Sequence, residues 1–257
     1  MIPSTLPTRS TFKATKPLPL AVSLRAARLI YSGLALFDGL DLKLAGGSVT
    51  GLLGPSGIGK SSLLRLLAGL TSPGISGELR GGDGQSLSGR VTYMAQQDLL
   101  LPWLNVLDNI TLGHRLRGEK ADQQQALDLL EQVGLADAAF TRPDTLSGGM
   151  RQRAALARTL MEDRPVVLMD EPFSGLDALT RLRLQALSAQ LLAGRTVLLV
   201  THDPLEALRM GDHILIMNGR PATLSALPDL PGAPPRDPGD PAVQNAYRAI
   251  LRLLGAV

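Results

Sequence analysis

The stretch that decides the fold is Gly54-Pro-Ser-Gly-Ile-Gly-Lys-Ser61, a glycine-rich turn between two apolar runs. Val49-Thr-Gly-Leu-Leu53 precedes it, and Ser62-Leu-Leu-Arg-Leu-Leu-Ala-Gly69 follows it. The first run is typical of a buried strand, and the second has the spacing of an amphipathic helix. The spacing inside the turn (Gly, four residues, then Gly-Lys-Ser) is that of a phosphate-binding loop, or P-loop.

The residue types of this loop suit it to bind a nucleotide. Glycines allow backbone N–H groups to converge on an anion, and the helix N-terminus adds the positive end of its dipole. Lys60 is expected to reach the β- and γ-phosphates, and the hydroxyl of Ser61 to bind Mg²⁺. The predicted nucleotide contacts are Gly54, Pro55, Ser56, Gly57, Ile58, Gly59, Lys60, Ser61 and Ser62. The alternative is an ordinary glycine-rich turn, and the pattern would arise by chance in about one chain of this length in a hundred.

The composition limits the class of protein. The chain has 257 residues, of which 44% are hydrophobic and 19% charged, enough for a large globular domain with a sizeable core. It contains no cysteine, which excludes disulfides, thiolate metal sites and a cysteine nucleophile. The net charge of +3 is too small to indicate nucleic acid as a partner. No apolar run approaches the roughly 20 residues that span a bilayer, so we expect a cytoplasmic protein that reaches a membrane only through a partner.

The sequence suggests three parts. Residues 1–20 have little periodicity and are expected to be a flexible leader. Residues 21–219 carry the signals of an α/β domain, with an inserted helical subdomain at about residues 98–160. Residues 220–257 are a proline-rich tail followed by an apolar stripe at helical spacing, formed by Val243, Ala246, Tyr247, Ile250, Leu251 and Leu254. The stripe is expected to pack back on the domain, and the alternative is a partner-binding helix.

Apolar runs, periodicity and turn residues predict the individual elements. Strands are expected at residues 21–26, 29–31, 34–37, 40–44, 49–53, 77–80, 90–95, 165–169, 196–200 and 213–217. Helices are expected at residues 62–69, 106–112, 121–133, 149–161, 178–192 and 203–210. Turns are expected at residues 71–74 and at Asn218-Gly219, the latter ending the last strand.

Two carboxylates follow the apolar run Pro165-Val-Val-Leu-Met169, which is typical of a buried parallel strand. Ligands of open α/β sheets bind at the carboxyl ends of such strands. Adjacent acids at a strand end are usually only solvated. Beside a P-loop, however, Asp170 can hold the Mg²⁺ shell and Glu171 can take a proton from attacking water.

The three histidines differ in their placement. His202 follows the apolar run at residues 196–200, at the carboxyl end of a second predicted buried strand, where a contact to the γ-phosphate is expected. His114 and His213 have no such placement, and we expect structural or surface roles for them.

Leu146-Ser-Gly-Gly-Met150 opens the predicted helix at residues 149–161. Ser147 is a good capping residue, so a plain helix N-cap is one interpretation. A helix start with exposed N–H groups is also a second anion site, and the residues alone leave both interpretations open.

Taken together, these motifs resemble those of the ATP-binding subunit of ABC transporters over about residues 21–219. The P-loop is then the Walker A motif, and Val166 to Asp170 is the Walker B strand, with Glu171 next. Leu146 to Met150 resembles the family signature, although most of the family has Gln where Met150 stands. Ser62, which is often Thr in the family, is the other departure, and neither removes a named ligand.

The resemblance implies further roles. Ser174-Gly-Leu-Asp177 matches the D-loop, and His202 matches the switch histidine. Gln96 matches the Q-loop glutamine, with Gln97 as the less favoured choice. Tyr31 stands where the family stacks an aromatic ring on adenine, whereas its pattern alone indicates a half-buried strand residue.

The resemblance also implies a fold, a mechanism and partners. The fold is an α/β P-loop NTPase with a RecA-like mixed sheet, an antiparallel β subdomain and an inserted α-helical subdomain. ATP and Mg²⁺ would bind between two copies arranged head to tail, with Ser147, Gly148, Gly149 and Asp177 of one copy facing the P-loop of the other. Glu171, His202 and Gln96 would be catalytic, and Ser61, Gln96 and Asp170 would hold the metal. Membrane permease subunits, and indirectly a periplasmic or lipid-anchored binding protein, would be the other partners, at the cytoplasmic face of the inner membrane.

The stretch from Gln96 to Asn109 resembles one group within the family, the bacterial importers of nitrate, sulfonate, taurine and pyrimidine thiamine precursors. Its Met-Ala-Gln-Gln-Asp version, at residues 94–98, looks most like the hydroxymethylpyrimidine importers. The alternatives are a sulfonate, taurine or nitrate importer, an exporter ATPase, a soluble ABC ATPase and, from another class, a small-molecule kinase.

Overall fold

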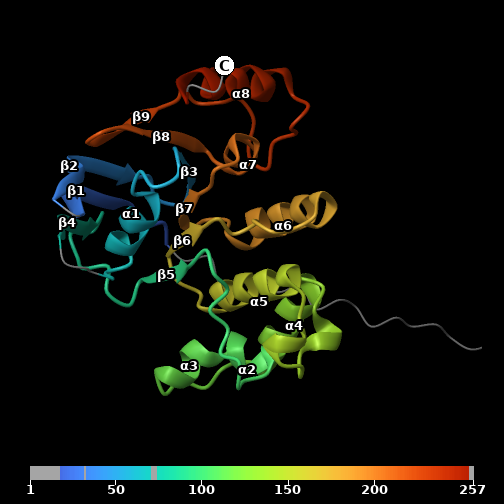
Figure 1. Ribbon diagram of the computed structural model, residues 1–257. Helices are drawn as coiled ribbons and strands as arrows, with labels where there is room; N and C mark the ends of the chain where they lie inside the picture. The colour runs from blue at the N-terminus through green and yellow to red at the C-terminus, as the bar shows by residue number, and fades with distance from the viewer. Residues whose placement is uncertain (1–17, 32, 71–73, 255–257) are drawn as a thin grey trace, which may run out of the picture.

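The chain folds into two β-sheets flanked by helices (Figure 1). The computed structural model describes residues 18–31, 33–70 and 74–254. The strands are β1 (Val22–Tyr31), β2 (Leu34–Leu44), β3 (Val49–Leu53), β4 (Ile75–Gly81), β5 (Val91–Met94), β6 (Val166–Asp170), β7 (Thr196–Val200), β8 (His213–Gly219) and β9 (Ala222–Ala226). The α-helices are α1 (Lys60–Leu67), α2 (Val106–Ile110), α3 (Leu112–Leu116), α4 (Gln123–Gln132), α5 (Gly148–Met161), α6 (Ala178–Leu191), α7 (Pro204–Met210) and α8 (Pro241–Leu253). The expected leader at residues 1–20 lies almost entirely outside the described residues, as do residues 71–73 of the expected turn.

The larger sheet positions the motifs. Within the described residues it has six strands in the order β5-β6-β7-β3-β8-β9, and all neighbours are parallel except the antiparallel pair β8 and β9. Every residue of β6 and of β7 is buried, as continuous apolar runs predict for central parallel strands. The P-loop strand β3 lies between β7 and β8.

The smaller sheet is antiparallel, with the order β2-β1-β4 in the described part of the chain. The expected strands at residues 21–26 and 29–31 form one strand, β1, which continues through an irregularity at Ala26, whose φ is 48°. The Ala26 amide donates to Asp41 Oδ1 at 2.8 Å and so keeps a partner despite leaving the ladder. The expected strands at residues 34–37 and 40–44 likewise form one strand, β2.

Two local expectations are wrong. The expected helix at residues 106–112 is divided into α2 and α3 at Thr111, whose hydroxyl donates to the Leu107 carbonyl at 3.0 Å, a bond that bends helices. The expected turn at Asn218-Gly219 lies inside the hairpin of β8 and β9, and the chain reverses at Arg220 and Pro221 instead. Strand β9 is also missing from the predicted strands, because the proline content of the stretch that contains it indicates a tail.

Helices cover the two ends of the larger sheet. Helices α2, α4 and α5 pack together on the side of β5, and α8 lies on α7 at the end of β8 and β9 (Figure 1). Val243 and Ile250 of the C-terminal stripe are buried in a cluster with Leu208 and Ile216, so this helix packs back on the domain as expected. No helix in the described part of the chain is both long and apolar enough to cross a bilayer.

Arg236 fastens the proline-rich tail to α7. Its buried guanidinium donates to the carbonyls of Leu208 at 3.0 Å, Gly211 at 2.5 Å and Pro231 at 3.1 Å. Gly211 directly follows the last turn of α7, where carbonyl groups lack partners within the helix. The Arg236 side chain therefore caps the C-terminus of α7 and holds the tail against this helix.

Replacing Arg236 with methionine is expected to destabilise the protein, because it keeps apolar volume and leaves these carbonyls without a donor. An unpaired buried acceptor costs about 1–3 kcal/mol, so the free energy of unfolding in urea should fall by at least that amount. Arg248→Met, an exposed arginine on α8, is the control and should change it little. An unchanged unfolding midpoint for Arg236→Met would show that water replaces the guanidinium at no cost.

Candidate active site

The sequence motifs converge at one edge of the larger sheet. The P-loop follows β3, Asp170 ends β6 with Glu171 directly after it, His202 follows β7, and Gln96 follows β5. These strands are parallel neighbours in the order β5-β6-β7-β3, so their carboxyl ends lie at the same edge. This is the edge at which open α/β sheets bind ligands.

Glycine is required in the P-loop for space as well as for backbone conformation. A Cβ atom at Gly54 would lie 2.5 Å from the carbonyl oxygen of Met217 on the neighbouring β8. Gly59 has a φ of 111° and would place a Cβ atom 3.2 Å from the ring of Phe37. The loop is therefore wedged between β8 and the smaller sheet, with Gly59 directly before α1.

Lys60 is the cation of the loop. Its ammonium donates to the carbonyls of Gly54 at 2.7 Å and Pro55 at 3.0 Å, which uses two of its three N–H groups and fixes the side chain along the loop. Burial lowers the pKa of Lys60, while the carboxylates of Glu171 and Asp170 act in the opposite direction. The side chain is placed to direct its positive charge at an anion held by the loop.

Asp170 and Ser61 form the predicted metal site. The Asp170 side chain is buried and hydrogen-bonded to that of Ser61. Burial raises the pKa of Asp170, and the bond to Ser61 and the charges of Lys60 and Arg65 partly offset the rise. A carboxylate and a hydroxyl are oxygen ligands of the kind that Mg²⁺ prefers, so the two residues fit this ion.

Glu171 and His202 form a close pair at the ends of β6 and β7. Nδ1 of His202 lies 2.6 Å from Oε2 of Glu171, and the imidazole is otherwise exposed. Desolvation raises the pKa of the Glu171 carboxyl, and the charge and hydrogen bond of His202 oppose the rise. A carboxylate with a raised pKa is a stronger base, as proton abstraction from water needs.

The backbone holds Glu171 in a strained conformation. Its φ is 52°, in the left-handed region that non-glycine residues rarely adopt. Its amide donates to the Val200 carbonyl at 2.9 Å, and its carbonyl accepts from Ser174 Oγ at 2.9 Å and from Gln152 Nε2 at 3.3 Å. Such strain persists only where the surroundings determine the geometry, and it is frequent at functional sites.

The signature residues lie at the start of α5, and the D-loop residue Asp177 lies directly before α6. Ser147 caps α5, with its Oγ accepting from the Met150 amide at 3.3 Å, and Ser147 and Gly148 are exposed. Asp177 caps α6 and accepts from the Thr180 amide at 3.0 Å, and its hydrogen bonds with Thr180 lower its pKa. Figure 1 shows α5 packed beside α4 and apart from the P-loop helix α1. Ser147, Gly148 and Asp177 are thus open to solvent in the single chain.

Tyr31 and Gln96 are both exposed near the ends of strands. Tyr31 ends β1 with 70% of its surface exposed, as a ring that stacks on a ligand requires, so the half-buried alternative is wrong. Gln96 is exposed immediately after β5. The other histidines lie elsewhere: His114 is in α3, and His213 begins β8 and pairs with Asp229 at 3.1 Å.

The structure adds residues that the sequence motifs do not mark. Gln152, one turn into α5, donates to the carbonyls of Glu171 and Pro172 and so ties the signature helix to the Walker B end. Asp98, two residues after Gln96, pairs with Arg151 Nε at 3.2 Å and accepts at its carbonyl from Arg158. These bonds join segments that are distant in sequence, so no local spacing could have revealed them.

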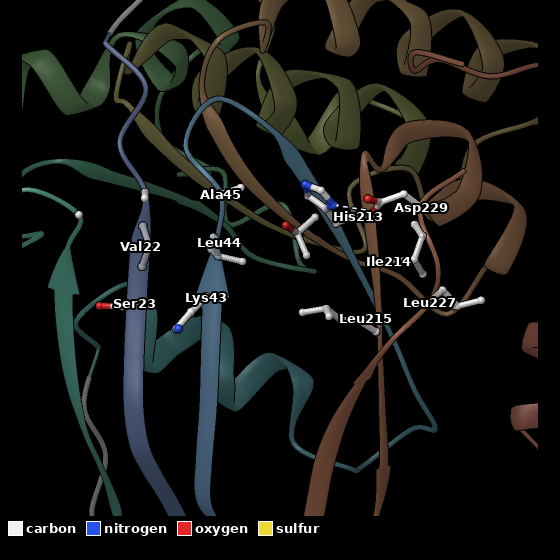
Figure 2. Close-up of a pocket in the computed structure, with 14 residues that line it drawn as sticks. Val22, Ser23, Lys43, Leu44, Ala45, His213, Ile214, Leu215, Leu227 and Asp229 are labelled. Atoms are coloured by element: carbon white, nitrogen blue, oxygen red, sulfur yellow. Dashed lines mark hydrogen bonds and ion pairs between the residues drawn. The ribbon is translucent and has the colours of Figure 1, made fainter. Parts of the chain in front are cut away.

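A cavity of about 500 Å³ lies near the amino ends of β3 and β8, beside the smaller sheet (Figure 2). Its lining includes Val22 and Leu44 of the smaller sheet, Thr50 near the start of β3, and His213 and Leu215 of β8. Because Thr50 pairs with His213 at the amino ends of their strands, the cavity is separate from the carboxyl edge that carries the P-loop. It contributes no residue to the nucleotide site.

Comparison with known proteins identifies the family. The model of the ABC transporter family matches residues 37–174, which span the P-loop, the signature and the Walker B strand. The chain belongs to this family of ABC ATPases. Within it, the chain is an ATP-hydrolysing transporter subunit, and ATP is its ligand.

Its relatives include named subunits and solved structures. It is 45% identical over 238 residues to the aliphatic sulfonates import ATP-binding protein SsuB of Delftia acidovorans, covering 91% of this chain and 94% of the relative. An uncharacterized ABC transporter ATP-binding protein of Haemophilus influenzae is 40% identical, with 91% of this chain and 98% of the relative covered. A dimeric post-hydrolysis structure of the cassette MJ0796 with ADP and Pi has 28% identity and a TM-score of 0.72, covering 82% of this chain and all of that one.

Proposed function

We propose that this chain supplies the energy of ATP hydrolysis to an importer of aliphatic sulfonates. The observation that carries the proposal is the 45% identity to the Delftia acidovorans sulfonate import subunit over 91% of this chain. Sulfonate import subunits of Pseudomonas syringae and Rhodococcus jostii, at 41% and 45% identity, support the same cargo. These relatives favour the sulfonate alternative over the hydroxymethylpyrimidine importer that residues 94–98 resemble.

Hydrolysis takes place between two copies of the chain arranged head to tail. The P-loop and Lys60 of one copy hold the phosphates of ATP, with Tyr31 against adenine. The exposed N-terminus of α5 in the other copy, with Ser147 to Gly149, caps the γ-phosphate through its N–H groups and dipole. The exposure of Ser147 and Asp177 in the single chain and the dimeric MJ0796 structures support this arrangement.

Glu171 is the general base of this site. Its carboxylate takes a proton from the attacking water, while His202 orients that carboxylate and contacts the γ-phosphate. Ser61, Asp170 and Gln96 would hold Mg²⁺, which would supply positive charge to neutralise the phosphates. The 2.6 Å contact between His202 and Glu171 and the hydrogen bond between Ser61 and Asp170 support these roles.

The energy reaches the membrane through the Q-loop segment. Gln96 and Asp98 lie where the chain passes from the sheet into the helical region at about residues 98–160. Closure of the nucleotide site therefore moves the sheet and the helical region together. Permease subunits receive this motion at the cytoplasmic face of the membrane, and a binding protein delivers the cargo to them from outside.

The function is tested in the assembled transporter. When the chain is purified with its permease in lipid and supplied with the binding protein, an alkanesulfonate is expected to stimulate ATP turnover, because cargo delivery favours closure of the ATP site. Phosphate release measures the stimulation, with hydroxymethylpyrimidine, taurine and nitrate as competing cargoes. Stimulation by hydroxymethylpyrimidine and not by an alkanesulfonate would overturn the assignment of cargo while leaving the ATPase unaffected.

A further inference from the structure

A second cluster of buried polar groups lies next to the site, between α6 and α7. Glu206 is 5% exposed, Gln185 2% and Ser188 0%. Gln185 Nε2 donates to Glu206 Oε2 at 3.4 Å. Oε1 of Glu206, Oε1 of Gln185 and the Ser188 hydroxyl have no hydrogen-bond partner in the described part of the chain. Burying such groups costs free energy, which calls for a functional reason at this place.

One side of the cluster holds the segment that carries the switch histidine. The Thr201 side chain is hydrogen-bonded to Glu206, and its Oγ1 accepts from the Asp203 amide at 3.1 Å. Asp203 Oδ1 in turn accepts from the Glu206 amide at 3.4 Å. Glu206 is therefore tied to the residues on both sides of His202. The imidazole itself is exposed apart from Glu171, so its position depends on this segment.

The other side of the cluster leads to the D-loop. Arg181 Nη1 lies 3.6 Å from Asp203 Oδ2, and Arg181 Nη2 donates to the Leu176 carbonyl at 3.1 Å. Leu176 precedes the D-loop residue Asp177, which caps α6. One arginine thus joins the D-loop backbone to the segment that carries His202.

We propose that Glu206 and Arg181 are positioning residues that hold the His202 segment in register with the D-loop. The inference rests on the proposed role of His202 beside Glu171. Because Asp177 faces the other copy in the proposed dimer, contact with that copy is transmitted through Arg181 and Asp203 to the imidazole. Hydrolysis then proceeds only when the D-loop is engaged.

The charge of Glu206 bears on this link. Desolvation raises the pKa of Glu206 to about 7, with Asp203 and Glu171 adding to the rise and Thr201 and Arg181 opposing it. The groups that face Glu206 are Arg181 and Gln185 from α6, Thr201 and Asp203 from its own segment, and Glu171, which directly follows β6. Ionised Glu206 is repelled by the two neighbouring carboxylates, so the cluster is held most firmly when Glu206 is neutral.

The raised pKa of Glu206 makes the stability of the protein depend on pH. A carboxyl whose pKa is higher in the folded protein than in the unfolded chain contributes stability that is complete at low pH. That contribution is lost as pH rises from about 4.5, the ordinary value, to about 7. Ionisation of Glu206 should therefore lower the free energy of unfolding over this interval, and Glu206→Gln should remove that part of the fall.

The experiment compares variants of the full chain by ATP turnover and ATP affinity. Glu206→Leu and Arg181→Met are expected to lower kcat about ten-fold or more with little change in KM, because misplacing a catalytic group costs rate and not binding. The kcat of the wild type is expected to decline as pH rises through 7. Glu206→Gln should retain most of kcat and should not show this decline. Glu131→Leu, an exposed glutamate on α4, is the matched control.

The outcomes separate this inference from the proposed function. His202→Ala is measured alongside: if it leaves kcat unchanged, the proposed role of His202 fails. If His202→Ala lowers kcat while Glu206→Leu and Arg181→Met stay within about two-fold of wild type, the positioning role fails alone. Arg181 is partly exposed, so Arg181→Met keeps the test decisive if Glu206→Leu does not fold.

Discussion

Replacing Glu171 with glutamine is expected to lower ATP turnover by about 10²–10⁴-fold, the usual contribution of a general base. The amide has the same shape and can still contact His202, but it cannot take a proton from water. ATP affinity should stay near that of the wild type, because Lys60 and the P-loop are untouched. Binding without hydrolysis should therefore hold two copies together around ATP.

Single-turnover phosphate release and size-exclusion chromatography with ATP check both parts of this expectation. The variant should elute as a dimer in ATP and as a monomer in ADP, while Glu131→Gln, the same change on an exposed helix, should behave as wild type. In the wild type, desolvation raises the pKa of Glu171. As the pH is lowered, turnover should therefore begin to fall at a higher pH than it would with an ordinary glutamate as the base. Turnover near wild type for Glu171→Gln would assign the base to another residue.

The sequence predicts the part of the fold that local pattern encodes. The runs that form β6 and β7 are apolar almost throughout, so burial on both faces and parallel pairing follow from composition alone. Carboxyl ends of parallel strands share one edge, which is why the order of residues along the chain is enough to bring Asp170, Glu171 and His202 together. The ABC ATPase fold, the ATP ligand and the transporter class are confirmed by the comparisons.

The remaining features depend on contacts between distant segments. Gln152 meets Glu171, and Glu206 meets Gln185, only because packing brings their helices to the ends of β6 and β7. In the sequence, a buried glutamate within a helical pattern cannot be distinguished from a solvent-exposed one, because periodicity does not reveal its partners. Strand β9 is likewise not predicted from the sequence, because it lies in a proline-rich stretch and forms a strand by pairing with β8.

Mixing two inactive variants is expected to restore ATP turnover, and this is the most direct test of the composite site. Lys60→Ala removes the cation of the P-loop. Ser147→Asp keeps a capping side chain on α5, since Asp caps as well as Ser, and places a carboxylate against the γ-phosphate of the other copy. In either homodimer both ATP sites carry one defect, so turnover should fall about 10²-fold or more.

In a head-to-tail heterodimer the two defects fall in the same site. The other site then combines an intact Lys60 from the Ser147→Asp copy with an intact Ser147 from the Lys60→Ala copy, so turnover should reappear and should depend on the mixing ratio. Ser147→Asn, which keeps the cap without the charge, separates electrostatic repulsion from loss of the helix start and should retain most activity. If one intact site is not enough for turnover, the mixture should still bind nucleotide at that site and form ATP-dependent dimers. A mixture that neither binds ATP between the two copies nor hydrolyses it would mean that each chain completes its own site, against the exposure of Ser147 and Asp177 in the single chain.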